Sequence, residues 1–177
     1  MVFFASFQFL IMGLYKNKYR IESIRLKEWD YQNPWWYYVT INTKNHYPWF
    51  GDVANGKMLL NKIGKIVENE WKKTVIIRRN VDLDYFVVMP NHIHGIIIIR
   101  EGQAEGLHYS LQQIIGSYKN VATKDIRQKV NKDFAWQPSF YDHVTRKEES
   151  LEKIREYIKN NPLKWELDRN NISNLWM

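Results

Sequence analysis

Hydrophobic and polar positions in the first half of the chain predict a strand, a hairpin and a helix. Trp35–Thr43 is rich in aromatic and β-branched residues, which is typical of a strand. Asn55-Gly56 lies between two apolar segments, Trp49–Val53 and Lys57–Leu60, and this pair favours the type I′ turn of a β-hairpin. Asn61 can then cap a helix. The helix is indicated by apolar residues at helical spacing: Ile63, Ile66, Val67, Trp71 and Val75.

Two consecutive runs then predict neighbouring antiparallel strands. Val81–Met89 alternates between apolar and polar residues, whereas His92–Arg100 contains almost no polar position after its second histidine. We therefore expect the second strand to be central in the sheet and covered on both faces. The polar segment Glu101–Leu107, with two glycines, predicts a mobile connection.

The last third predicts two helices separated by an irregular or edge-strand segment, Asp133–Asp142. The first helix is indicated by an apolar stripe: Leu111, Ile115, Tyr118, Ala122 and Ile126. The last helix has the stripe Leu151, Ile154 and Ile158. Because Pro162 disfavours helical geometry at Asn161, we expect Tyr157 in the final turn of this helix. The order of elements predicts an α+β sandwich with an antiparallel sheet.

Length and composition are those of a single domain. The 177 residues are 45% hydrophobic, and the chain has no internal repeat, low-complexity tract or linker rich in Pro, Gly or Ser. We expect residues 23–177 to form one domain and residues 1–22 to form an N-terminal extension. The absence of cysteine excludes disulfides and zinc–cysteine sites.

The apolar N-terminal segment Met1–Met12 does not predict a membrane protein. A transmembrane helix needs about 20 apolar residues, and a secretory signal usually opens with positive charge, which is absent before Lys16. We therefore expect a cytoplasmic protein without a membrane span, and the sequence leaves open whether translation starts at Met1 or at Met12.

The charge of the chain favours a polyanionic partner. The formal net charge is +7 and the pI is near 9.4. Aromatic residues make up 15% of the chain, and aromatic faces among Lys and Arg suit the stacking of unpaired bases. An aromatic-rich core explains most of these residues equally well.

Four residues carry the candidate chemistry. Side chains alternate along a strand, so His92 and His94 point to one face and can hold one metal ion, although an alternating strand also produces such pairs by chance. Tyr157 and Asn161 lie one turn apart on the last predicted helix. A tyrosine hydroxyl, a metal site and an amide ligand are the groups needed to cleave a phosphodiester through a covalent tyrosine intermediate.

Three motifs in this order resemble those of the single-tyrosine HUH transposases. They are His92-Ile93-His94, then Trp136-Gln137 followed by Phe140–His143, and finally Arg155–Pro162. The chain is most similar to the REP-associated tyrosine transposases, and the resemblance runs from about residue 23 to about residue 165. It implies a ferredoxin-like or RNA-recognition-motif-like core and an enzyme that cleaves and rejoins single-stranded, hairpin-bearing DNA.

The resemblance also implies a role for each site residue. Tyr157 would be the nucleophile, leaving a 5′-phosphotyrosine and a free 3′-hydroxyl; because the ordinary pKa of tyrosine is about 10, it would need a nearby cation or base. His92, His94 and Asn161 would hold Mg²⁺ or Mn²⁺. Asn161 can instead be a helix C-cap. Tyr118 is a competing nucleophile, but its place in an apolar stripe indicates a core residue.

Basic side chains give a less specific prediction. Six candidates for phosphate contacts are Arg25, Lys27, Lys119, Lys124, Arg127 and Arg146. Each can equally be an ordinary solvated charge. His143 is a candidate for supporting the site or contacting DNA.

Two other functions remain open. One is a domesticated relative that binds structured single-stranded nucleic acid without cutting it. The other is an RNA-binding domain in which Trp36 or Tyr38 stacks bases, which leaves the histidines, Tyr157 and Asn161 unexplained. The sequence also leaves open whether the protein is a monomer or a homodimer, and whether the tyrosine serves its own histidines or those of a partner.

Overall fold

The computed structural model describes residues 14–15, 19–20, 26, 28–101, 109–145, 148–168 and 171. Its strands are β1 (Leu14–Tyr15), β2 (Tyr19–Arg20), β3 (Trp36–Asn42), β4 (Gly51–Ala54), β5 (Lys57–Leu60), β6 (Val81–Val88), β7 (His92–Ile99) and β8 (Tyr141–Val144). Its α-helices are α1 (Lys62–Ile77), α2 (Leu111–Lys129) and α3 (Glu148–Asn160), and its 3₁₀ helices are η1 (Lys44–His46) and η2 (Pro162–Leu167).

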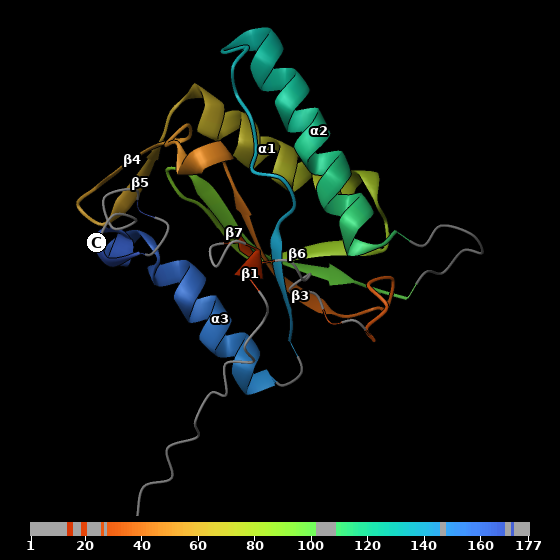
Figure 1. Ribbon diagram of the computed structural model, residues 1–177. Coiled ribbons are helices and arrows are strands. Elements are labelled where there is room, and N and C mark those ends of the chain that lie inside the picture. The colour runs from red at the N-terminus through yellow and green to blue at the C-terminus, as the bar shows by residue number, and fades with distance from the viewer. Residues whose placement is uncertain are drawn as a thin grey trace, which may run out of the picture.

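A four-stranded antiparallel sheet in the order β6-β7-β3-β8 is the centre of the fold. Helices α1 and α2 lie on one side of this sheet and α3 lies on the other (Figure 1). This is the α+β architecture that the sequence predicts. Strand β7, which begins with the two histidines, is central and is buried at every position except Ile98, which is half-buried.

Alternation along β7 divides its side chains between the two faces. Ile93 and Ile97 belong to the core cluster under α1 and α2, whereas Ile96 packs with Leu151 and Ile158 of α3. Gly95 lies beneath Trp71, where an added Cβ would be 2.5 Å from Cζ2 of the indole. The helix α1 can therefore approach the sheet only because this strand position has no side chain.

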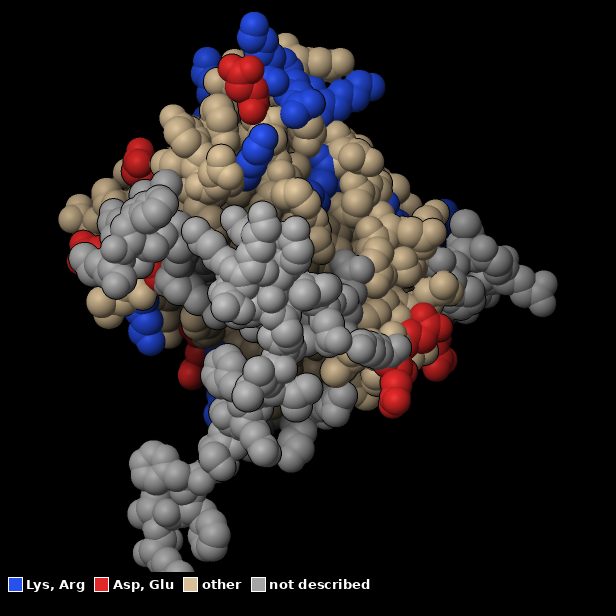
Figure 2. All heavy atoms as spheres, in the orientation of Figure 1, with Lys and Arg blue, Asp and Glu red and all other residues tan. Residues whose placement is uncertain are grey.

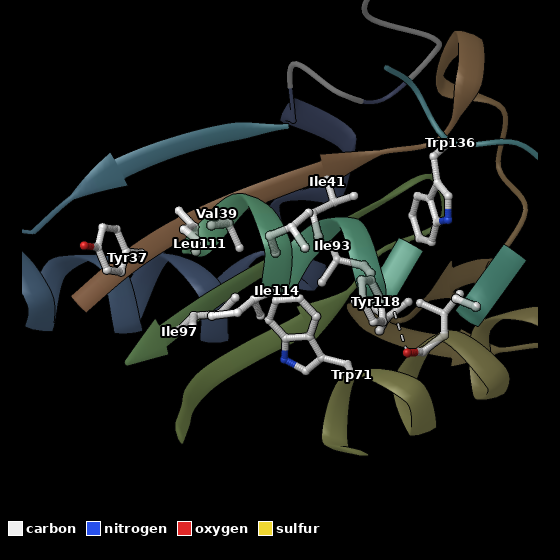
Figure 3. Packing of buried hydrophobic residues seen from close by; sticks show 14 of the residues in the cluster. Tyr37, Val39, Ile41, Trp71, Ile93, Ile97, Leu111, Ile114, Tyr118 and Trp136 are labelled. Atoms are coloured by element: carbon white, nitrogen blue, oxygen red, sulfur yellow. Dashed lines mark hydrogen bonds between the residues drawn. The ribbon is translucent and has the colours of Figure 1, made fainter. Parts of the chain in front are cut away.

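The core under α1 and α2 is aromatic and aliphatic (Figure 3). Tyr118 is 4% exposed, packs edge-on against Trp71 with ring centroids 5.2 Å apart, and donates a hydrogen bond of 3.2 Å to the carbonyl of Val67. Burial raises the pKa of Tyr118 well above its ordinary value. The interpretation of Tyr118 as a core residue is confirmed.

Local turn and cap signals are confirmed as well. Asn55 and Gly56 have φ angles of 52° and 69°, the left-handed pair of a type I′ turn, between β4 and β5. Asn61 caps α1 by accepting a hydrogen bond from the amide of Gly64. In the stripe of α1, however, Thr74 is buried and Val75 is only half-buried.

The expectation that Pro162 keeps Asn161 out of helical geometry was wrong. Its φ and ψ are −58° and −42°, so it keeps helical geometry, and the chain continues directly into η2. A following proline disfavours this geometry without forbidding it. Here the buried side chain of Asn161 donates a hydrogen bond to Asp168, and the backbone carbonyl of Asn161 accepts one from the amide of Lys164. Tyr157 still lies in the last turn of α3.

Several predicted features lie outside the described residues: all of Met1–Met12, all of Glu101–Leu107 except Glu101, and Arg25, Lys27 and Arg146. The segment 133–142 is irregular until β8 begins at Tyr141, where it pairs with β3 as an edge strand. None of the helices in the described part of the chain is both long enough and apolar enough to cross a membrane.

Candidate functional site

Two buried histidines form the centre of the site. His92 is 0% exposed and His94 is 1% exposed, and their Nε2 atoms are 3.0 Å apart. They meet because they are two residues apart on β7 and both face α3. Two imidazole nitrogens at this separation can bind the same ion at an angle of about 90°, given metal–nitrogen bonds of about 2.1 Å.

Asn91 fixes the tautomer of His92. Its amide nitrogen donates to the carbonyl of His46 at 2.9 Å, which leaves Oδ1 directed at His92 Nδ1, 2.8 Å away. Because an amide oxygen only accepts hydrogen bonds, Nδ1 carries the proton and Nε2 carries the lone pair. His92 Nε2 is therefore prepared to accept a cation or a hydrogen-bond donor.

Two hydroxyl groups from β3 support His94. Its Nδ1 lies 2.8 Å from Tyr38 Oη and 2.9 Å from Thr40 Oγ1. A hydroxyl can donate or accept, so both neutral tautomers of His94 find a partner at Nδ1. In the tautomer with the proton on Nδ1, the two Nε2 lone pairs face each other, which is unfavourable unless a cation lies between them.

Tyr157 reaches this pair from α3 of the same chain. Its Oη lies 3.3 Å from His94 Nε2, and its ring packs edge-on against the rings of Tyr38 and His94. The side chain is 40% exposed and lines an open pocket. Residues on the apolar side of the same helix, Leu151 and Ile158, hold it against Ile96. The tyrosine and the histidines thus form one site within a single chain.

An ion pair between α3 and β6 fixes the position of the tyrosine helix. Two nitrogens of Arg155 lie 2.7 Å and 2.6 Å from Asp84 Oδ2, and Arg155 also pairs with Glu152. The guanidinium lies 6.0 Å from the ring centroid of Tyr85. Asp84 and Tyr85 both reach Arg155 because the pairing of β6 shifts between Leu83 and Phe86, so that two residues oppose one on β7.

Asp168, which follows η2, lies beside the histidines and is hydrogen-bonded to Asn161. Asn161 is 2% exposed, and its Nδ2 donates to Asp168 Oδ2 at 3.1 Å. Its Oδ1 is buried and has no hydrogen-bond partner among the described residues. Ligand atoms of His92, His94 and Asp168 all lie within 4.8 Å of one another. The group therefore offers two nitrogens, a carboxylate oxygen and an unsatisfied amide oxygen, a donor set that fits Mn²⁺ or Mg²⁺.

Asp168 is the site residue that the sequence analysis missed. It follows η2 and lies outside any periodic pattern, and single aspartates after a helix are common. Its only sequence signal is its position soon after Asn161. Trp165 in the same segment lies against His92, with ring centroids 6.0 Å apart.

The predicted basic residues that the structure describes lie away from the histidines, on α2. Lys119 donates to the carbonyls of Gln137 and Ser139, and burial lowers its pKa. Arg127 donates to the carbonyl of Phe134. Figure 2 shows Lys and Arg side chains gathered at the end of the molecule where α2 ends. A contact between these residues and DNA stays a prediction.

Comparisons with known proteins identify the family of this chain and the fold that it shares. Residues 39–161 match the model of a family described as IS200-like transposases. An uncharacterized protein of Haemophilus influenzae is 37% identical over 163 residues, which cover 83% of this chain and 91% of that protein. The fold is similar to the structure of a REP-associated tyrosine transposase bound to a REP hairpin, with a TM-score of 0.54 and 19% identity over 82% of this chain and 74% of that chain.

Proposed function

Because the chain belongs to the IS200-like transposase family, we propose that it cleaves and rejoins single-stranded, hairpin-bearing DNA with Tyr157 as the nucleophile. The observation that carries this proposal is the distance of 3.3 Å between Tyr157 Oη and His94 Nε2. The same fold in a transposase bound to a REP hairpin supports the choice of substrate.

The proposed step is a phosphoryl transfer. Tyr157 Oη forms a bond to the scissile phosphorus while the bond from phosphorus to the 3′ oxygen breaks. The phenolic proton leaves to solvent, to which the side chain is open, and the 3′ oxygen gains a proton. The products are a 5′-phosphotyrosine and a 3′-hydroxyl. The reverse attack by a 3′-hydroxyl joins a strand without ATP, because the phosphotyrosine is itself a phosphodiester.

We assign His92, His94 and Asn161 as ligands of a divalent cation, Mg²⁺ or Mn²⁺, and we add Asp168. The bound cation would neutralise charge on the scissile phosphate. Asn91, Tyr38 and Thr40 orient the two imidazoles through their Nδ1 atoms. The Oδ1 of Asn161, buried without a partner in the described part of the chain, supports its assignment as a ligand.

We further propose that the tyrosine acts with its own histidines. Helix α3 reaches the site through its own packing on the sheet and through the pair Arg155–Asp84. A homodimer is then not needed to complete the site.

The test is formation of a covalent adduct. Hairpin DNA carrying a 3′ label is incubated with Mn²⁺ or Mg²⁺, and the label should migrate with the protein in SDS. Tyr157→Phe removes only the hydroxyl and should abolish the adduct while DNA binding persists. Tyr118→Phe is the matched control and should still form it. An adduct that survives Tyr157→Phe contradicts the assignment, whereas binding without any adduct favours the non-cleaving relative.

A further inference from the structure

A groove of about 680 Å³ opens beside Tyr157, between α3, η2 and the edge strand β8. It is within the range of about 300 to 1,000 Å³ that pockets for small ligands occupy. Its wall on the sheet is formed by Tyr38, Tyr141 and His143, and its helical wall includes Lys153 and Lys164. Tyr157, Asn161 and Asp168 line the end nearest the histidines.

Strand register explains why these aromatic side chains lie in the groove. Tyr141 pairs with Thr40, and His143 pairs with Tyr38, so both share the face that holds His94. Both are on the edge strand, and both are exposed. Tyr38 differs, because its ring stacks on His94 and its hydroxyl contacts Nδ1. The open aromatic surface of the sheet is therefore on β8.

The opposite wall supplies positive charge. Lys153 is on α3, one turn before Tyr157, and Lys164 is on η2; both side chains are exposed. An ammonium group can pair with a backbone phosphate whatever the DNA sequence, and a tyrosine ring can stack on any base. The two walls thus suit the two parts of one nucleotide.

We propose that this groove binds the nucleotide next to the scissile phosphate in single-stranded DNA. Its base stacks on Tyr141, with His143 beside it, and its backbone phosphate pairs with Lys153 and Lys164. The inference rests on the proposed function, because Tyr157 at the end of the groove defines which phosphate is attacked. A paired base cannot stack in this way, so the groove also selects for an unpaired strand.

The test separates binding from cleavage by using the Tyr157→Phe background throughout. Affinity for a fluorescein-labelled single-stranded oligothymidine is measured by anisotropy. Tyr141→Ala should weaken binding about 10-fold, the loss expected for one stacked base. The double variant Lys153→Ala with Lys164→Ala should weaken binding and reduce its dependence on salt. Tyr47→Ala and Lys159→Ala remove an exposed tyrosine and an α3 lysine outside the groove, and should bind as the parent does.

Photocrosslinking gives the position directly. An oligothymidine with one 5-iodouracil should crosslink to Tyr141 or His143, as mapped by mass spectrometry of the peptides. Crosslinks confined to α2, or equal affinities for the Tyr141→Ala and Tyr47→Ala variants, would overturn the proposal. Cleavage is scored separately: if the groove variants lose binding but wild type forms no adduct, the groove stands as a site for single-stranded DNA and the proposed cleavage is contradicted.

Discussion

The two faces of the central sheet are built from the same strands but differ in chemistry. Under α1 and α2 the buried side chains are almost all apolar, and Trp71 and Tyr118 fill the space between helix and sheet. Under α3 an apolar contact around Ile96 gives way to a buried polar group. This group consists of Thr40, His92, His94, Asn161 and Asp168.

The difference shows where the molecule gains stability and where it holds reactive groups. Buried polar atoms are costly unless they are hydrogen-bonded, and the histidines meet this condition through Asn91, Tyr38 and Thr40. The large apolar face can offset the remaining cost, which includes Oδ1 of Asn161, an atom that has no partner among the described residues. Substitution to alanine at adjacent residues of β7 should therefore affect metal binding on one face of the sheet and stability on the other.

The largest effect is expected for metal binding. His94→Ala removes a proposed ligand and should weaken Mn²⁺ binding on the order of 100-fold or more. Its neighbour in sequence, Ile93, faces the apolar core, and Ile93→Ala should keep the Mn²⁺ affinity of wild type. Calorimetric titration measures both. Equal affinities in the two variants would contradict the metal assignment.

The opposite face should determine stability. Trp71→Ala is expected to lower the free energy of unfolding by about 3–5 kcal/mol, because it leaves a cavity above Gly95. Urea unfolding measures this loss, and the folded fraction should bind Mn²⁺ as wild type does. If the variant does not fold, Trp71→Phe gives a smaller loss in the same direction. A stable variant with impaired metal binding would show that the faces are coupled.

A smaller effect is expected where α3 is attached to the bulge of β6. Asp84→Asn should cost about 1–2 kcal/mol, since Arg155 is partly exposed and retains Glu152. It should also slow adduct formation at saturating DNA, because Tyr157 is two residues away from Arg155. The control is Asp82→Asn, also on β6, which breaks a more exposed ion pair with Arg100. It should cost less than about 0.5 kcal/mol and should not slow adduct formation.

The smallest effect concerns alkaline pH. The pKa of Tyr118 is raised by burial, so above about pH 10 the unfolded chain releases a proton that the folded protein keeps. Stability should therefore fall as the pH rises beyond that value. Urea unfolding at stepwise higher pH should show a shallower fall for Tyr118→Phe than for wild type. Part of the fall should persist, because burial also raises the pKa of Tyr37. Parallel curves would contradict this account.

The sequence by itself determined the local elements and the directions of their side chains. The period of the hydrophobic pattern and the residues that favour turns depend only on neighbouring positions in the sequence. The hairpin at Asn55-Gly56, the capped helix α1 and the central strand β7 could therefore be predicted. The spacing of His92 and His94 placed them on one face, and the apolar stripe of α3 placed Tyr157 beside that stripe.

Only the tertiary structure decided how these pieces meet. Three contacts join segments that are distant along the chain or lie outside any periodic pattern. They are Tyr157 with His94, Asp84 with Arg155, and Asp168 with the two histidines. At Asn161, hydrogen bonds to Asp168 and from the amide of Lys164, both in the segment that follows it, outweigh the preference imposed by Pro162. Such contacts depend on how the elements pack against one another. Residue spacing within one element does not determine which other element will contact it.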